Sequence, residues 1–534
     1  MIPHLFWLIL IPVFAGGAIM LCPLCHARRL VVAVQTLVTA LSYYTFHVVR
    51  QQGAILQNVG GWGDYVGITL RADRLAVVMV LMTAVLYWFM LLYNLRREYA
   101  NNLFLMLFLV MQGLIFGIFL SNDLFNLFVL VEVSTVVISI LIMYKKDSQA
   151  IYDGMLYLLI NLVSMSFFLF GTGIIYKFTG VVDMYGIREV LRGLDSARPV
   201  ILPYAFLVTA VSLKSALMPL FSWLPKAHGT PSAPSVVSAV LSGIYVKTGL
   251  YMFLRIQETF APVLDTSQLF LYLGFITAVA GFVLAVAQKD LKLILAYHTV
   301  SQVGLIMMGI NMGGEQNFIG GVYHIVNHAF FKSTLFLTAG MVIDTYKTRN
   351  VYEIEGVFRR MPLVGIATIM AILGITGAPF FNGSISKYWI AYGTGQTWAE
   401  YGLLLVNFGT ILSFVKYSRI FFGGGAYPRE SLSPIRERVV LGMGLVCLLG
   451  GVLGAQLIGF LFDVDLNIQA LSYVGKTITF VLTLAAGVAL YHLWLKKNKV
   501  LEKLKKLELG FNGVSATITI YFFFLLVYLT LTTA

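Results

Sequence analysis

Long apolar stretches separated by short polar ones recur along the whole chain. Each stretch approaches the length of about 20 residues that a helix needs to cross a bilayer. On this measure the chain has about sixteen membrane-spanning segments, near residues 5–22, 30–49, 72–93, 103–120, 123–143, 155–177, 201–221, 233–255, 267–287, 292–310, 317–342, 363–392, 401–422, 438–461, 474–494 and 513–533. The pattern predicts an all-α polytopic membrane protein with about 14–16 transmembrane helices.

Two of the segments contain an interrupting proline. Pro219 lies in the seventh, and Pro379 lies in the twelfth within "GITGAPFFNGSISKYW". A proline at membrane depth frees backbone groups that lipid cannot satisfy, so each helix is predicted to be broken there. The breaks are five helices apart, and five is odd, so the two units around them are predicted to be inverted. Paired broken helices in inverted halves point to a transport site.

The breaks also suggest how the chain is divided. We expect three N-terminal helices in 1–100, a first five-helix unit in 101–256, a second, inverted unit in 266–424, and C-terminal helices with a short basic connecting segment in 436–534.

Ionisable side chains occur inside several of the apolar segments. Because a charge in hydrocarbon is costly, such residues are functional candidates by default. The candidates for proton translocation are Glu132, Lys214, Lys247, His324, His328, Lys332 and Lys387.

Glu132 and Lys214 are predicted to form a switching pair that binds and releases protons. The alternative for Glu132 is a structural contact with another helix. Lys247 lies mid-segment between Gly243 and Gly249, which could let helices or water approach.

His324, His328 and Lys332 are spaced by four, so they share one helix face. Two histidines at this spacing could bind a metal, but the ammonium one turn away would repel the cation and no third ligand is evident. A proton or water path therefore suits them better, and two interhelical hydrogen bonds are the alternative. His298 is a weaker candidate, and Lys416 is expected to reach the membrane surface.

Composition supports a membrane protein and narrows its function. The chain of 534 residues is 59% hydrophobic and 11% charged, which excludes an ordinary soluble domain. Its net charge of +13 is interpreted as loop charge rather than as a nucleic-acid surface. Loops after odd-numbered segments, with Lys292 counted in one of them, carry more than twice the Lys and Arg of the others, which predicts that both termini face outward. The pair Cys22 and Cys25 lacks further ligands, and no cofactor or metal is expected.

Two stretches are similar to a known family. "KSALMPLFSWLPKAHGTPSAPSVVSAVLSGIYVKTGLY" and "HIVNHAFFKSTLFLTAG" resemble the antiporter-like proton-translocating proteins. These include large subunits of Mrp sodium/proton antiporters and antiporter-like subunits of respiratory complex I and membrane-bound hydrogenases. The resemblance covers roughly residues 70 to 425. It implies a fourteen-helix core with two inverted five-helix units and a proton path that crosses a central hydrated axis.

The resemblance also implies roles for individual residues. The family's fifth-helix glutamate matches Glu132, and its seventh- and eighth-helix lysines match Lys214 and Lys247. Its eleventh-helix histidine region matches His324 and His328, followed by Lys332, and its twelfth-helix charge matches Lys387. The chain departs from the core by two extra C-terminal segments, joined by a basic stretch from Leu495 to Gly510 that is too short for a long lateral helix.

The expected function is proton conduction within a complex of integral membrane subunits in the plasma membrane. The first hypothesis is an Mrp-type cation antiporter that exchanges protons for sodium. The alternative is a pumping module of a hydrogenase or complex I-like redox enzyme, with the redox chemistry on partner subunits. A third hypothesis is a self-sufficient transporter of an organic solute.

Overall fold

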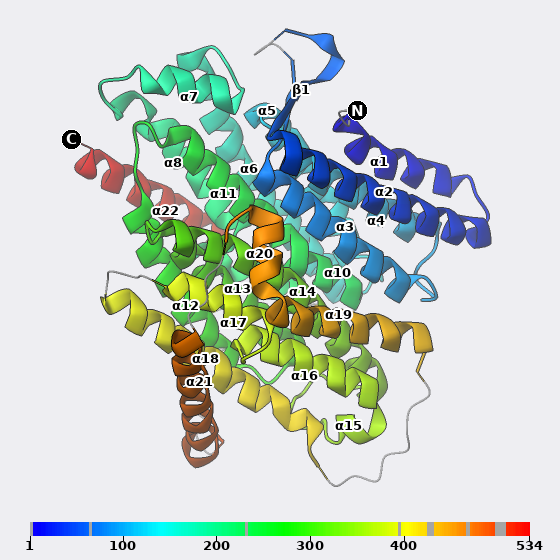
Figure 1. Cartoon of the computed structure of the whole chain (residues 1–534). Helices are drawn as coiled ribbons and strands as arrows, with labels where there is room; N and C mark the ends of the chain where they lie inside the picture. The colour runs from blue at the N-terminus through cyan, green and yellow to red at the C-terminus, as the bar shows by residue number, and fades with distance from the viewer. Residues whose placement is uncertain are drawn as a thin grey trace.

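The computed structural model describes residues 4–63, 67–229, 233–392, 397–423, 432–465, 470–496 and 509–533. The described chain is a bundle of helices with one small β-hairpin at one end (Figure 1). The N-terminal elements are α1 (Phe6–Met20), α2 (Leu24–Gln52), β1 (Ile55–Asn58), β2 (Thr69–Ala72) and α3 (Arg74–Asn94). The two strands are antiparallel, with Ile55 opposite Ala72.

The middle of the chain supplies most of the bundle. The first half comprises α4 (Asn102–Leu120), α5 (Leu124–Ile142), α6 (Ser148–Thr179), α7 (Met184–Arg192), α8 (Ile201–Lys214), α9 (Trp223–Gly229), α10 (Ser235–Val240) and α11 (Val246–Phe260). The second half comprises α12 (Ser267–Ala287), α13 (Leu291–Asn311), α14 (Glu315–Tyr346), α15 (Val357–Arg360), α16 (Pro362–Thr376), α17 (Asn382–Ala391) and α18 (Thr397–Ser418). The C-terminal helices are α19 (Pro434–Val452), α20 (Gly454–Phe462), α21 (Ala470–Leu490) and α22 (Phe511–Thr532).

The helices confirm the predicted membrane fold. Among the described residues, eleven helices are long and apolar enough to span a membrane, with α10 and α11 counted as one. The pair α19 and α20 is bent by 88° at its junction, and α1 and α16 are shorter apolar helices. The predicted segments that do not appear as plain spans are therefore short, bent, broken or, as with α14, rich in polar residues. The inverted relation of the two halves stays a prediction.

An aspartate or asparagine is the N-cap residue directly before many of the helices. Its side chain accepts a hydrogen bond from a backbone N–H three residues later, which satisfies one of the free donors of the first turn. These caps are Asp73 for α3, Asn101 for α4, Asp123 for α5, Asp147 for α6, Asp183 for α7 and Asp290 for α13. The caps fix where each apolar run starts as a helix.

The first predicted break occurs directly after Lys214, the last residue of α8. Neighbouring side chains satisfy backbone groups that the break frees. Trp223 Nε1 donates to the Leu213 carbonyl (2.7 Å), and the Met218 N–H donates to Thr277 Oγ1 (3.0 Å). The break is therefore tolerated because protein rather than lipid surrounds it.

The second break separates α16 from α17. Gly377 ends α16 in the left-handed region (φ +78°), which glycine adopts without a steric penalty. Lys387 Nζ donates to the Ile375 carbonyl (2.7 Å) in the last turn before the break. The lysine that the sequence singles out thus satisfies one of the carbonyls near the end of its broken helix.

Helices differ greatly in how much of their surface the protein covers. The most apolar windows of α10–α11 and α13 are 100% and 94% buried, whereas that of α21 is 11% buried. The centre of the bundle is therefore built by α10, α11, α13 and α14, and α21 lies at the edge beside α18 (Figure 1). The other C-terminal helix, α22, packs against α8, where Tyr521 OH donates to Ser212 Oγ (3.0 Å). The basic segment predicted to join these two helices lies largely outside the described residues.

Candidate functional site

Lys214 lies at the end of the half-helix α8 and is 2% exposed. Its Nζ donates to Thr135 Oγ1 on α5 (2.7 Å) and to Tyr245 OH (3.2 Å). Tyr245 is the last residue of a π-helical turn, Leu241–Tyr245, which joins α10 to α11. A cation at the C-terminal end of a half-helix is also stabilised by the helix dipole.

Glu132 lies on α5, three residues before Thr135, and its side chain is half-buried. The carboxylate interacts electrostatically with Lys214. Among the described residues, however, no ion pair or hydrogen bond joins the two side chains, because Lys214 is bonded to hydroxyl groups instead. The proposed switching pair stays a prediction, in which the two charges act across a gap.

Lys247 lies in the first turn of α11 and is completely buried. Its Nζ donates to the Ser242 carbonyl and lies 2.5 Å from His328 Nδ1 on α14. When Lys247 is charged, its ammonium group donates this hydrogen bond and His328 Nδ1 must accept it. The imidazole of His328 is then neutral and carries its proton on Nε2. The π-helical turn aims Lys247 at α14, and such turns are frequent at functional sites.

Two glycines allow these close approaches. A Cβ at Gly249 would lie 2.7 Å from the Lys214 carbonyl carbon, and a Cβ at Gly243 would collide with Ser333 of α14. Both collisions would push α10 and α11 away from their neighbours. The predicted close approach of helices at these glycines is therefore present.

His324 lies one turn before His328 on α14, and the two ring centres are 6.4 Å apart. His324 Nδ1 is 2.7 Å from Ser386 Oγ on α17, and Nε2 is 3.0 Å from Gln302 Oε1 on α13. Gln302 in turn donates to Thr410 Oγ1 on α18 (3.4 Å). His324 therefore connects the centre of the bundle to the second broken helix.

The remaining two lysines also lack an acidic partner among the described residues. Lys332 Nζ donates to the Leu295 carbonyl (2.6 Å). Lys387 Nζ donates to Asn407 Oδ1 on α18 (2.8 Å) as well as to the Ile375 carbonyl. Lys387 directly follows Ser386, the residue that contacts His324.

The structure thus brings six of the seven predicted residues, all except Glu132, into one row across the bundle. The row passes from Lys214 through Tyr245 to Lys247 and His328, then from His324 through Ser386 to Lys387, and Lys332 lies one turn beyond His328 on α14. Within the described part of the chain, the four lysines form hydrogen bonds with hydroxyl, carbonyl, amide or imidazole groups. An ammonium group without a counter-charge is expensive in a low-dielectric interior, so gaining or losing a proton strongly changes the energy of such a site.

Two buried histidines lie beside the row. His228 on α9 stacks on Phe336 (4.8 Å between ring centres), and His298 on α13 packs against Phe414 (4.7 Å). Neither histidine has a hydrogen-bonded ring nitrogen within the described part of the chain. The sequence indicated His298 weakly and missed His228, because the stretch after Pro219 reads as a loop rather than as a buried half-helix.

Two expectations about lysines were wrong. Lys416 does not reach the membrane surface: it is 5% exposed and donates to the carbonyls of Val286 (2.8 Å) and Gln288 at the end of α12. Lys292, counted as a loop charge, is 3% exposed and donates to the Ala233 carbonyl (3.0 Å). Lys416 satisfies carbonyls at the end of α12, and Lys292 satisfies one just before α10; spacing along a single helix cannot reveal either contact.

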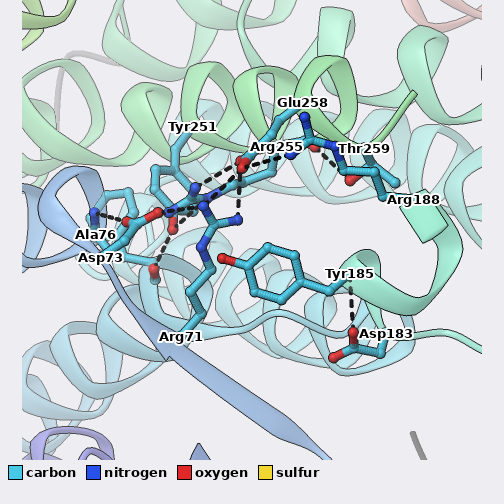
Figure 2. A network of polar contacts seen from close by, with 11 residues as sticks. Arg71, Asp73, Ala76, Asp183, Tyr185, Arg188, Tyr251, Arg255, Glu258 and Thr259 are labelled. Atoms are coloured by element: carbon cyan, nitrogen blue, oxygen red, sulfur yellow. Dashed lines mark hydrogen bonds and ion pairs between the residues drawn. The ribbon is translucent and has the colours of Figure 1, made fainter. Parts of the chain in front are cut away.

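A second group of charges lies at the end of the bundle that carries the β-hairpin (Figure 2). Arg255 on α11 donates to Asp73 Oδ1 (2.6 Å), Glu258 Oε2 (2.9 Å) and Tyr251 OH (2.9 Å). Arg71 on β2 forms two hydrogen bonds with Glu258 (2.8 and 3.0 Å) and contacts Asp73 (2.7 Å). This group, Arg71, Asp73, Arg255 and Glu258, is called the edge network below.

The edge network ties three parts of the chain together. Arg71 lies over the ring of Tyr185 on α7 (4.6 Å), and Arg188 of α7 approaches Glu258 (3.7 Å). Burial alone would raise the pKa of the Asp73 carboxyl, but the Arg255 and Arg71 guanidinium groups hold that pKa below its usual value. The sequence did not predict this network, because its members are distant in the chain. The spacing of Arg255 and Glu258 on one helix face was the only local indication of it.

Residues 121–414 match the family described as "NADH:quinone oxidoreductase/Mrp antiporter, TM". The match spans more than half of the chain and contains every candidate residue of the row. The chain belongs to this family. The family resemblance inferred from the motifs is thereby confirmed. The prediction that the chain is a multi-pass membrane protein is confirmed as well.

Similar proteins within the family are named as subunits of two different kinds of complex. The NADH-quinone oxidoreductase subunit N of Desulforudis audaxviator (strain MP104C) is 31% identical over 373 residues, covering 68% of this chain and 74% of that protein. The putative antiporter subunit mnhD2 of Staphylococcus aureus (strain Mu3 / ATCC 700698) is 28% identical over 407 residues, covering 74% of this chain and 80% of that protein.

Solved structures are similar to almost the whole chain. A chain of the membrane-bound sulfane sulfur reductase, an archaeal respiratory membrane complex, has a TM-score of 0.79 and 25% identity, over 90% of this chain and 99% of its own length. A chain of the Mrp complex from Dietzia sp. DQ12-45-1b also has a TM-score of 0.79, with 23% identity over 89% of this chain and 99% of its own. The fold is therefore shared to the same degree by a chain of a respiratory membrane complex and by a chain of an Mrp complex.

Proposed function

We propose that this chain is the proton-conducting subunit of a multi-subunit membrane complex, and that the complex is an Mrp-type antiporter exchanging protons for a cation such as sodium. The observation that carries the proposal is the buried row from Lys214 to Lys387, whose lysines bind neutral groups. Membership of a family whose relatives are named as subunits supports partner subunits in the membrane.

The first half of the row would take up and release protons at Lys214. Glu132 stabilises the charged ammonium from a distance, while Thr135 and Tyr245 hold Nζ in place in either protonation state. A hydroxyl can accept from an ammonium and donate to an amine, so the site tolerates both forms.

The centre of the row would pass the charge onward. Lys247 and His328 share a contact of 2.5 Å, and imidazole binds and releases protons near neutral pH. Two neighbouring cations disfavour each other, so a proton on Lys247 raises the cost of protonating His328 or Lys332. His324 then connects through Ser386 to Lys387, beside the second break.

Replacing Lys214 with alanine tests this proposal in proteoliposomes that contain the intact complex. We expect proton-coupled cation transport to be abolished, while the yield of assembled complex stays near that of the wild type. The matched control is Lys177→Ala, which removes an exposed lysine from the last turn of α6. Wild-type antiport in the Lys214→Ala vesicles would refute the proposed route.

A second candidate function is a proton- or sodium-pumping module of a respiratory complex. It is favoured by the subunit N relative and by the similarity to the sulfane sulfur reductase chain. Purification of the native complex distinguishes the two. Iron–sulfur subunits in the complex would select the redox module, and their absence together with antiport activity would select the antiporter.

A further inference from the structure

α21 contains one of the two C-terminal segments that are predicted to extend the chain beyond a fourteen-helix core, and it lies along α18. A cavity of about 430 Å³ lies between α17, α18 and α21. Its polar lining includes Lys387, Asn407 and Glu400 from the second half of the bundle and Lys476 from α21. The proton route derived above ends at Lys387 and makes no use of α21.

α21 is bonded directly to the second broken helix. Tyr473 OH accepts a hydrogen bond from the Phe380 N–H (3.0 Å), and it lies 3.1 Å from Ser384 Oγ. Phe380 lies between α16 and α17, in the left-handed region (φ +68°). A backbone N–H freed by a break at membrane depth needs a protein partner, and α21 supplies one.

Lys476 follows Tyr473 by three residues and therefore faces the same side of α21. Its Nζ donates to the Tyr388 carbonyl (3.1 Å) and lies 4.3 Å from the centre of the Tyr388 ring. Tyr388 is the residue after Lys387. The neighbouring apolar residues Val474 and Ile478 are 53% and 55% exposed, so the lysine turns inward while the apolar face of α21 turns outward.

Glu400 also lines the cavity. It is exposed in the first turn of α18 and interacts electrostatically with Lys476. The first turn of α18 is on the side that the distribution of loop charge predicts to be external. Glu400, Lys476 and Lys387 therefore line one space that extends from the first turn of α18, on the predicted external side, to the end of the row.

We propose that Lys476 is a further ion-translocation residue, which exchanges protons between Lys387 and the external side at Glu400. The inference rests on the proposed function of the row and adds its outer end. Two ammonium groups that share one cavity repel each other, so a proton arriving at Lys476 promotes release from Lys387 and the reverse. The extra helix α21 is then part of the ion path.

Transport by the intact complex in proteoliposomes tests this role with two substitutions. Lys476→Ala and Lys476→Arg should each lower transport by about tenfold or more, since a relay requires a group that can lose its proton. Arginine keeps the cation but stays protonated. Normal transport in Lys476→Arg would show that Lys476 is only a cationic anchor, and normal transport in Lys476→Ala would show no role; either result overturns the inference.

Two controls separate this test from that of the proposed function. Lys177→Ala should transport as the wild type does. Lys214→Ala, measured in parallel, should be inactive. If Lys214→Ala is inactive and the Lys476 variants are normal, the proposed function stands and the inference fails. If Lys214→Ala is active, the proposed function itself fails.

Water access to Lys476 gives a readout that does not depend on transport. In a chain whose native cysteines are replaced, Lys476→Cys should react with a water-soluble methanethiosulfonate about tenfold faster than Ile478→Cys, because only a hydrated thiol forms thiolate readily. Ile478 is the matched position on the outward face of the same helix. Equal rates at the two positions would mean that Lys476 does not face a hydrated cavity, and would overturn the inference.

Discussion

The edge network and the central row both hold buried charges, but they hold them in opposite ways. In the edge network, Arg255 and Arg71 each contact both Asp73 and Glu258, with several bonds of 2.6–3.0 Å. In the central row, Lys214, Lys247 and Lys387 contact hydroxyl, carbonyl, imidazole and amide groups. Cations are matched by anions in one region and by neutral dipoles in the other.

We interpret this difference as a structural use of charge in the edge network and as the proposed transport use of charge in the row. A guanidinium–carboxylate network fixes geometry, because arginine does not lose its proton and each bond has a defined direction. A lysine among neutral dipoles can exist with or without its proton, because no fixed anion holds it in the charged form. The same helix, α11, carries Arg255 in the first region and Lys247 in the second, so the edge network anchors the helix that carries the proposed proton site at Lys247.

Arg255→Ala should have the largest effect, and the effect should be on stability. It leaves Asp73 and Glu258 with fewer cationic partners, and breaking a buried pair in this way costs about 3–5 kcal/mol. We expect equilibrium unfolding of the detergent-solubilised complex to shift accordingly, while transport per folded complex is retained. Arg192→Ala is the matched control, because its pair with Glu189 is exposed and such pairs contribute about 0–1 kcal/mol. Equal shifts for the two variants would contradict a special role of the edge network.

Asn407→Asp should give one lysine of the row a carboxylate partner, as the arginines of the edge network have. The substitution places a carboxylate where an amide oxygen now lies 2.8 Å from Lys387 Nζ. A fixed anion stabilises the charged lysine, so transport should fall by about tenfold while assembly is unaffected. Asn407→Ala removes the amide without adding a charge. If both variants transport equally slowly, the loss of the amide group rather than the new charge pair is responsible.

The smallest effect concerns the pH dependence of stability at the edge network. The pKa of Asp73 is below its usual value of 3.8, so the carboxylate stabilises the folded state fully above that value. This contribution is lost as the pH falls through the lower pKa of the folded state. Asp73→Asn should lower stability at neutral pH and flatten this acid-induced loss, as measured by unfolding between pH 2 and pH 6. An unchanged acid profile in Asp73→Asn would show that other carboxylates dominate it.

The sequence predicted the spans, both breaks and the row of ionisable residues, and it did so for a physical reason. Lipid tolerates neither an unsatisfied backbone nor an unpaired charge, so Pro219, Pro379, Lys214 and Lys247 stand out against apolar neighbours. The spacing of His324 and His328 was also sufficient, because a helix has a known period. Each of these features can be recognised from the sequence of a single segment.

The partners of these residues could not be predicted in the same way. Lys214 bonds to Thr135 and Tyr245 rather than directly to Glu132, and Lys416 is buried against the end of α12. Each of these contacts joins helices that are distant in the chain. The choice depends on which faces cross and on how closely glycines let them approach, and neither quantity is written in a single segment.

The sequence by itself therefore determined that the chain crosses the membrane many times, where two helices break, and which charges lie at membrane depth. Only the tertiary structure decided which charges meet an opposite charge, as in the edge network, and which meet neutral groups, as in the row. The reason is that an apolar solvent imposes its requirements on each segment separately, whereas a charge is matched by whatever a neighbouring helix places within about 3 Å of it.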